Sequence, residues 1–533
     1  MEIHSLRPLT GSLVLAALVA AVPLASQVPE GWNQHRPLGS EGPGSAGTWW
    51  GAGLWAGEAH GPATPMVDAM GLGSGLSGAG FHLEGGHRLR SWDLAAEVLG
   101  NRDPQGRSYL TLYRGHAWWR GQSGWQAGFE QEPLTWGYGL NGGYLMSEAA
   151  RPVPKLRVES PMRPLSLWNV PLGTWGFQAF LGRLENDRQL SPLMQDLAWR
   201  RQAIANAGDP QAPLLTGYRL QAQFGPKVEF YANYTNLFAG TLKGVGMTDG
   251  YGTGDYLTAM FGLKDALAES HIDFTDPNRP AGDYRNKGRS GSNADVGVRV
   301  RVSALERMLD AEDVRVYFSR GSKGVTMTYS LFLHRPFYWL GKDAERDGRN
   351  LLQGHPKLFW YENQRKSSPN MVVPNDTVGI LMKWPGLRVG LEYQDTSNTE
   401  DQGHRSFAHG IYLTGFYTHG DPLGNAIGGE ARTFTFSCEA DLLPTLKLAT
   451  WVHLGDRLFR DDPTAWQGAH PGAAVRKDRT QEIQQNLAWQ FRPSTTLSLG
   501  AAWMRHGAVD FVAGRSGNGF RWYADLAYRW GRD

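Results

Sequence analysis

Large aromatic and polar residues are concentrated in a Gly- and Pro-rich stretch of the N-terminal half of the chain. Residues 133–144 include Trp136, Tyr138 and Asn141, and Arg151 begins a second Pro-rich step at 151–154. Gly and Pro occur too often here for a regular helix or strand. A plain linker would not need such large aromatic side chains. The stretch therefore predicts a built surface that can hold a ligand.

Sequence motifs for catalysis and metal binding are weak or absent. Two G-x-G-x-x-G strings, at 73–78 and 137–142, do not open a βαβ unit, and a Gly-rich chain produces them by chance. No G-x-S-x-G, H-E-x-x-H or Walker A sequence is present. The spacing of His404, His409 and His419 fits no standard metal set. The sequence predicts no catalytic residue, no cofactor and no metal site.

The N-terminus has the pattern of an export signal. An apolar run of 12 residues from Leu13 to Leu24 follows His4 and Arg7, and small residues follow the run. This run is too short to span a bilayer and has the length of a signal-peptide core. Residues 1–26 are therefore predicted to be a signal peptide. Cys438 is the only cysteine, so no intramolecular disulfide can form.

Composition narrows the class of protein. The 533 residues include 68 Gly, 21 Trp and 19 Tyr, and 53 basic residues nearly balance 51 acidic ones. Bulk charge therefore does not indicate a nucleic-acid partner. After the signal no apolar run approaches the length of a membrane-spanning helix. A secreted β-protein or a transmembrane β-barrel remains, and abundant Trp and Tyr suit the aromatic girdles of a barrel.

From about Phe81 onward, segments of roughly ten residues alternate apolar and polar side chains, as strands do. Clear examples lie at 92–99, 175–182, 296–303 and 483–491. About 18 such segments predict an all-β fold, a transmembrane antiparallel β-barrel, because closure removes the exposed sheet edges. We predict a Gly/Pro-rich periplasmic or lumenal segment at 27–75 and the barrel at 76–533.

The connections between these segments differ in length. Short turns are predicted at 225–227, 384–386, 443–445 and 493–495, and long loops at 239–293, 340–374 and 457–480, with an imperfect alternation around 420–430. Short turns at one end and long loops at the other are typical of outer-membrane barrels. Two loop helices are expected, one after Ser191-Pro192 and one at 256–269, packing over the barrel mouth.

Four stretches together resemble the Wzi family of capsule-assembly proteins, which are outer-membrane barrels. They are Leu134-Thr135-Trp136-Gly137-Tyr138-Gly139 continuing to Ala150-Arg151-Pro152-Val153-Pro154, then residues 182–188, Leu391-Glu392-Tyr393-Gln394-Asp395-Thr396-Ser397, and His409 through 422–428. The chain departs from the family at Ala149, at Phe407 and Gly410, and at its C-terminus, which does not end on an aromatic residue. The short segment before the barrel also does not match the periplasmic helical bundle known in the family.

The resemblance implies a lectin-like protein that attaches exported capsular or related polysaccharide to the cell surface without catalysis. Aromatic rings cover the C–H faces of sugars, and Arg forks bind uronate carboxylates. The candidate carbohydrate-binding residues are Trp136, Tyr138, Asn141, Arg151, Arg183, Glu185, Arg285, Arg289, Trp360, Tyr361 and Arg365. The expected partners are this polysaccharide, outer-membrane lipid and the barrel insertion machinery, with the chain acting as a monomer.

Two other functions stay open at this point. A porin or substrate-specific outer-membrane channel would have the same strand pattern but would conduct ions. An outer-membrane hydrolase would need a His–Ser or His–Asp pair at the barrel rim, which need not be close in sequence.

Overall fold

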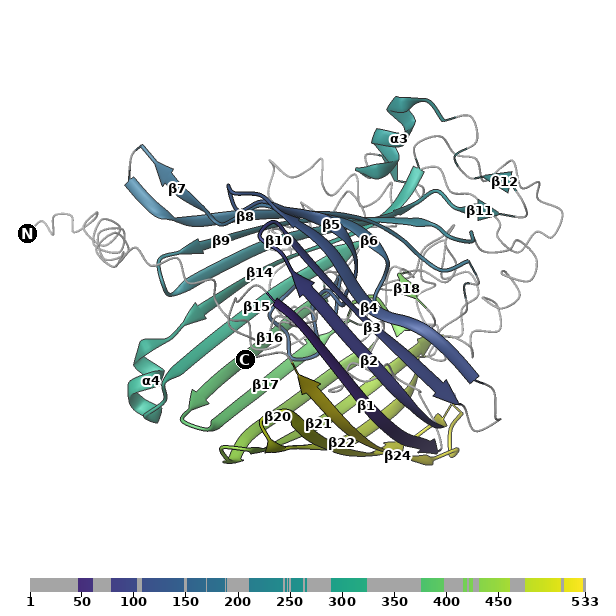
Figure 1. The fold of residues 1–533 in the computed structure, drawn as a ribbon, viewed down its shortest axis with the longest axis vertical. Helices are drawn as coiled ribbons and strands as arrows, with labels where there is room; N and C mark the ends of the chain where they lie inside the picture. Colours follow the sequence, from purple (N-terminus) through teal and green to yellow (C-terminus); the bar gives the residue numbers. More distant parts are fainter. Residues whose placement is uncertain are drawn as a thin grey trace, which may run out of the picture.

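The chain forms a closed antiparallel β-barrel of 18 strands in the computed structural model (Figure 1). The structure describes residues 47–60, 78–102, 108–147, 151–168, 170–186, 188, 210–242, 245–246, 248, 251–261, 264–265, 289–323, 375–396, 416–418, 421–424, 431–460, 475–509 and 512–530. The predicted signal peptide lies outside these residues.

Each wall strand pairs with its neighbour in ring order, and the last strand pairs with the first to close the barrel. In ring order the strands are β1 (Gly47–His60), β2 (Gly78–Arg88), β3 (Trp92–Arg102), β4 (Ser108–Arg120), β5 (Gln126–Gln131), β6 (Lys155–Glu159), β8 (Val170–Arg183), β9 (Leu214–Phe224), β10 (Val228–Phe238), β14 (Arg289–Arg301), β15 (Asp313–Lys323), β16 (Asn375–Trp384), β17 (Leu387–Asp395), β20 (Ala431–Leu443), β21 (Leu446–Arg460), β22 (Val475–Arg492), β23 (Thr495–His506) and β24 (Gly517–Trp530). The prediction of about 18 strands is confirmed.

Apolar side chains face outward and polar side chains face the lumen, as the alternation predicts. On β22, Ile483 and Trp489 are exposed on the outer face, whereas Glu482 and Gln484 are buried inside. Exposed outward aromatics gather toward both ends of the wall, among them Trp50, Trp92, Trp119, Trp489 and Trp530 at one end and Phe81, Trp503 and Phe520 toward the other. This distribution fits the two aromatic girdles of a membrane barrel.

The two ends of the barrel differ in the length of their connections. The turns at 225–227, 385–386, 444–445 and 493–494 are short and lie at one end, which we call the short-turn end. The strand ends that flank residues 184–213, 239–288, 324–374 and 396–430 lie at the other end, the long-loop end. The predicted separation of short turns and long loops is confirmed. The irregularity expected around 420–430 falls within one long-loop connection, which carries the two-residue strands β18 (Tyr417–Thr418) and β19 (Asp421–Pro422).

Strand β1 corrects the predicted start of the barrel. Residues 47–60 pair with β2 on one side and β24 on the other, so they belong to the wall and not to a separate segment before it. The glycines that suggested a linker face the lumen, where Gly51 and Gly53 lie against the side chains of Glu84 and His82 on β2. A Cβ at either position would collide with these polar side chains. Glycine is therefore needed at Gly51 and Gly53 to leave room for the side chains of the neighbouring strand, and not to form a turn.

One wall strand is interrupted. Strand β6 and the short β7 (Arg163–Leu167) both pair with β8, so together they act as one strand broken at 160–162. The β7–β8 hairpin extends past the neighbouring strands at the short-turn end (Figure 1).

The described helices are short and lie in connections. Helix α3 (Thr253–Met260) falls in the predicted 256–269 region but starts earlier, and α4 (Ser303–Leu309) in the β14–β15 turn was not predicted. The helix predicted after Ser191-Pro192 lies outside the described residues. No helix in the described ranges is long and apolar enough to cross a membrane. Three minor strands, β11 (Thr241–Leu242), β12 (Val245–Gly246) and β13 (Lys264–Asp265), complete the β10–β14 connection.

Candidate functional site

The connection between β5 and β6 folds into the lumen instead of leaving the barrel. We call residues 132–147 the plug segment. Trp136 at its centre is 0% exposed, packs against the Phe180 ring at 5.3 Å and donates from Nε1 to Gln178 at 2.6 Å. Both partners lie on the inner face of β8. The aromatic, glycine-supported stretch of the sequence is therefore held inside the wall by packing and hydrogen bonds.

The plug segment also reaches strands almost opposite its own attachment. The backbone nitrogen of Leu140 donates to Glu392 on β17 at 2.6 Å, and Asn141 Nδ2 donates to the same carboxylate at 2.9 Å and to Thr435 on β20 at 2.6 Å. Leu140 packs in a buried cluster with Tyr317, Leu381 and Trp451. The segment therefore crosses the lumen from β8 to β20.

Tyr138 is fixed between two walls of the lumen. The guanidinium carbon of Arg299 lies 4.4 Å from the centre of its ring, and the ring of Tyr231 meets it edge-on at 4.9 Å. Arg299 is in turn paired with Glu229. Burial, followed by the nearby Glu229 carboxylate, raises the pKa of Tyr138, so the phenol stays neutral. The cation–π and aromatic contacts indicate that Tyr138 holds the plug segment in place.

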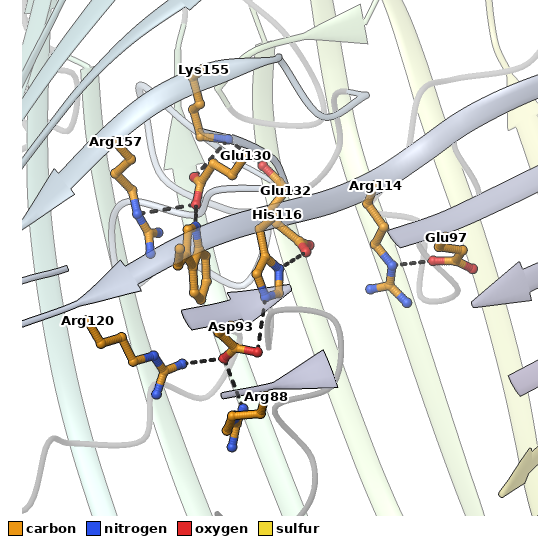
Figure 2. Close-up of polar contacts among 11 residues, drawn as sticks. Arg88, Asp93, Glu97, Arg114, His116, Arg120, Glu130, Glu132, Lys155 and Arg157 are labelled. Carbon is orange, nitrogen blue, oxygen red and sulfur yellow. Dashed lines mark hydrogen bonds and ion pairs between the residues drawn. The ribbon is translucent and has the colours of Figure 1, made fainter. Parts of the chain in front are cut away.

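A buried ion-pair network anchors both ends of the lumenal excursion (Figure 2). Glu130, at the end of β5, accepts a hydrogen bond from Trp118 Nε1 at 2.9 Å and pairs with Lys155 Nζ at 3.2 Å and Arg157 Nε at 3.3 Å. Lys155 is the first residue of β6 and also donates to the backbone oxygen of Glu132. The chain thus leaves and re-enters the wall through one charged junction. Because every member is paired, burying these charges is tolerated.

His116 extends this network to the neighbouring strands. Its Nδ1 lies 2.8 Å from Glu132 Oε1, its Nε2 lies 3.6 Å from Asp93 Oδ1, and its ring stacks on Trp118 at 4.0 Å. Asp93 also pairs with Arg88 and Arg120, and Glu97 pairs with Arg114 nearby (Figure 2). The first residue of the plug segment is therefore connected to β2, β3 and β4.

The far end of the excursion contacts the long-loop end. Ser147 donates from its backbone nitrogen to Leu423 at 2.7 Å, and its hydroxyl donates to the backbone oxygen of Gly424. Thr418 on β18 donates to Glu185 at 2.8 Å. The backbone nitrogen of Arg183 donates to Pro154 at 3.1 Å. Together with the Glu392 contacts, these bonds bring together all four stretches that define the sequence resemblance.

The predicted binding residues fall into four sets. Trp136 and Asn141 are fully buried and Tyr138 is mostly buried, so they act in packing and offer no surface to a polymer in this structure. Arg151 and Arg183 are exposed at the long-loop end, and Glu185 is half-buried against Thr418. Arg289 is the first residue of β14. Arg285, Trp360, Tyr361 and Arg365 lie outside the described residues.

Several residues that position the plug segment were not predicted as site residues. They are Glu392, Tyr317, Glu130, Lys155 and His116, all buried in the lumen. The available signal was a charged residue at a lumen-facing position of an alternating strand. Within the described ranges, no group of three or more His, Cys, Asp or Glu side chains is arranged to hold a metal ion.

A closed antiparallel wall with an apolar outer face, a polar lumen and a lumen-crossing segment of its own chain defines a plugged transmembrane β-barrel. Residues 78–284 match the family model of the capsule assembly protein Wzi. This match agrees with the family resemblance predicted from the four stretches, of which the first two, ending at residue 188, lie within the matched residues. No curated protein sequence matches the chain significantly.

One solved structure with a TM-score above 0.5 supports the fold. The chain is similar to Wzi, described as a carbohydrate-binding β-barrel of the outer membrane involved in group 1 capsule assembly in Escherichia coli, with a TM-score of 0.55, 14% identity and coverage of 90% of this chain and 83% of that one. It also matches the Pseudomonas aeruginosa proteins OprD (TM-score 0.43, 9% identity, 92% and 97% coverage) and OpdL (TM-score 0.40, 10% identity, 91% and 98% coverage).

Proposed function

We propose that this protein is a non-catalytic, lectin-like barrel of the bacterial outer membrane that retains an exported polysaccharide at the cell surface. The observation that carries this function is that all four stretches of the resemblance meet around the excursion 132–154, in the lumen at Glu392 and toward the long-loop end at Gly424, Thr418 and Pro154. The Escherichia coli relative with the same fold is described as carbohydrate-binding. In this proposal the long-loop end faces outward, as in other outer-membrane barrels.

The exposed basic residues of this end suit an acidic polymer. Arg151 and Arg183 lie on two segments joined by the hydrogen bond between Arg183 and Pro154, and both side chains are exposed. A guanidinium binds a uronate carboxylate at two points. A polymer presents many copies of its repeat, so even weak single contacts can retain it. The protein would be exported by its N-terminal signal, inserted by the barrel machinery and active as a monomer.

The test is a deletion strain of the host that is complemented with the full-length gene. We expect the deletion strain to make the polymer in normal amounts but to release most of it into the medium, and the wild-type gene to restore cell-bound polymer. An Arg151→Ser, Arg183→Ser double variant should restore less than the wild type. The matched control is Arg90→Ser, Lys227→Ser, which removes the same charge at the short-turn end. Polymer that stays attached to the deletion strain would refute the proposal.

A further inference from the structure

Three basic side chains form a patch on the outside of the barrel wall. Lys477 and Arg479 on β22 and Arg505 on β23 are exposed, whereas the residues that alternate with them, Asp478 and His506, are buried on the lumenal face. Because successive side chains of a strand point to opposite faces, the three cations point away from the lumen. We call these three residues the outer basic patch.

The members of the outer basic patch are close enough to act on one ligand. Arg505 lies directly opposite Gln481, so Arg479 is its diagonal neighbour. Diagonal neighbours are about 7–8 Å apart, and residues two positions apart on one strand are about 7 Å apart. Arg479, whose side chain is 74% exposed, has a weak ion pair with Asp456 at 3.3 Å. Among the described residues, Lys477 and Arg505 form no ion pair.

The patch sits beside the apolar part of the wall. Toward the short-turn end the outward positions become Ile483 on β22, Trp503 on β23 and Phe520 on β24, all at least 40% exposed. Arg505 is only two residues beyond Trp503 along the same face. Aromatic side chains mark the boundary between hydrocarbon and headgroups in membrane barrels, and basic side chains just beyond them reach the headgroup layer.

We propose that the outer basic patch binds the phosphate groups of an anionic lipid in the leaflet at the long-loop end. The inference rests on the outer-membrane placement under the proposed function. Charge complementarity and the neighbouring aromatic boundary favour a lipid headgroup. A polysaccharide held at the site is a poorer match, because Arg151 and Arg183 lie nearly half-way round the ring, on the β5–β6 connection and β8. Basic side chains on the outer face of the wall point toward the surrounding lipid and away from the opening of the barrel.

The test compares lipid binding by the purified full-length protein in detergent with EDTA present. The probes are lipid A carrying two phosphates and lipid A from which both phosphates have been removed, with bound lipid counted by native mass spectrometry. We expect the wild type to favour the phosphorylated form. The Lys477→Ser, Arg479→Ser, Arg505→Ser variant should lose affinity for it on the order of 100-fold, because each of the three basic residues near a membrane contributes on the order of 1 kcal/mol.

Two controls separate the possible outcomes. Arg90→Ser, Arg163→Ser, Lys227→Ser removes the same charge at the short-turn end and should bind as the wild type does. The single variant Arg505→Gln should show a smaller loss in the same direction and guards against misfolding of the triple variant.

Equal binding of both lipids by the wild type, or unchanged binding by both patch variants, would overturn the proposal. If the triple patch variant lost binding to the host polymer but bound both lipids as the wild type does, the patch would be a polysaccharide site instead. A triple variant that loses lipid binding but still retains polymer on cells would show that the two proposals stand separately.

Discussion

Asn141 and Glu392, which are 251 residues apart in the chain, are joined by two hydrogen bonds in the lumen. The backbone nitrogen and the side-chain amide of Asn141 both donate to Glu392 Oε1, at 3.3 and 2.9 Å. The other carboxylate oxygen accepts from Leu140 N and from the Tyr317 hydroxyl, each at 2.6 Å. One buried carboxylate therefore fixes the middle of the plug segment to the wall and joins two of the stretches that carry the resemblance.

Replacing Glu392 with Gln should loosen the plug segment. The amide of Gln turns one acceptor oxygen into a donor, so two of the four donors lose their acceptor while they remain buried. We expect the free energy of unfolding to fall by about 1–3 kcal/mol. Two measurements check this: the urea midpoint of the folded barrel, and proteolytic cleavage between residues 132 and 154. Ionic current through single molecules in planar bilayers should also rise.

Glu312→Gln is the matched control for this change. Glu312 is about half exposed at the short-turn end and pairs with Lys383 at 3.1 Å. Exposed ion pairs contribute little to stability. The control should therefore leave the urea midpoint, the cleavage pattern and the current unchanged. If Glu392→Gln conducts as little current and resists the protease as well as Glu312→Gln does, the hydrogen bonds of Glu392 do not hold the plug segment.

Gly217 on β9 leaves room for the buried rings of Trp136 and Phe180. A Cβ at this position would overlap the Phe180 ring and lie 2.7 Å from Trp136 Cη2. Gly217→Ala should therefore lower the free energy of unfolding by about 1–3 kcal/mol through overpacking. It should also shift the tryptophan emission. Gly254→Ala in α3 is the control, because nothing lies within 4 Å of its Cβ position. Equal urea midpoints for the two variants would contradict this prediction and would mean that Trp136 and Phe180 shift to accommodate the added methyl group without loss of stability.

The strands were predictable because the signal is local. Trp175 and Phe177 face outward and Gln178 and Phe180 face the lumen as the alternation along β8 indicates. Strand β1 escaped prediction because its glycines match His82 and Glu84 on β2, and that match exists only after the strands pair. A Gly-rich wall strand and a Gly-rich linker have the same composition.

The candidate site was only partly predictable for a similar reason. The sequence shows that the stretch around Trp136 is unusual, and the resemblance adds three further stretches to it. Neither shows that Asn141 meets Glu392 or that Thr418 meets Glu185, because these pairs depend on the strand register and on closure of the ring. Burial of Trp136 and Asn141 follows from the same closure, and it turns two expected ligand contacts into packing contacts.

Lys155 should be among the most sensitive residues of the wall. It is 2% exposed, and Lys155→Met would leave the fully buried Glu130 carboxylate with Arg157 and Trp118 alone. Removing one partner of a buried ion pair costs about 3–5 kcal/mol. The urea midpoint should drop accordingly. Lys447→Met is the control, because Lys447 is 69% exposed and lies 3.7 Å from an exposed Asp441 carboxylate. Similar midpoints for the two variants would contradict a structural role for the Glu130 junction.

The short-turn end should carry a pH-dependent contact at Glu306 in α4. Burial alone would raise its pKa, but hydrogen bonds from Arg301 at 2.5 Å and from the Val314 backbone at 3.2 Å outweigh burial and lower the pKa below the ordinary 4.5. A carboxyl group with a lowered pKa stabilises the folded state above its unfolded pKa, and this stability is lost as the pH falls through the folded value. The turn should therefore be stable at neutral pH and weaken below about pH 4.5.

Glu306→Gln tests this contact by hydrogen exchange of the α4 amides, compared with the wild type at each pH. At pH 7 the variant should lose about 1–2 kcal/mol of local protection, because it loses a charged acceptor. The difference should shrink as the pH falls below 4.5, where the wild-type carboxyl itself becomes protonated. Asp310→Asn removes a charge from the same turn without touching Arg301 or Val314 and should exchange like the wild type. A wild-type-to-variant difference that stays constant down to pH 3 would mean that the Glu306 charge does not stabilise the turn.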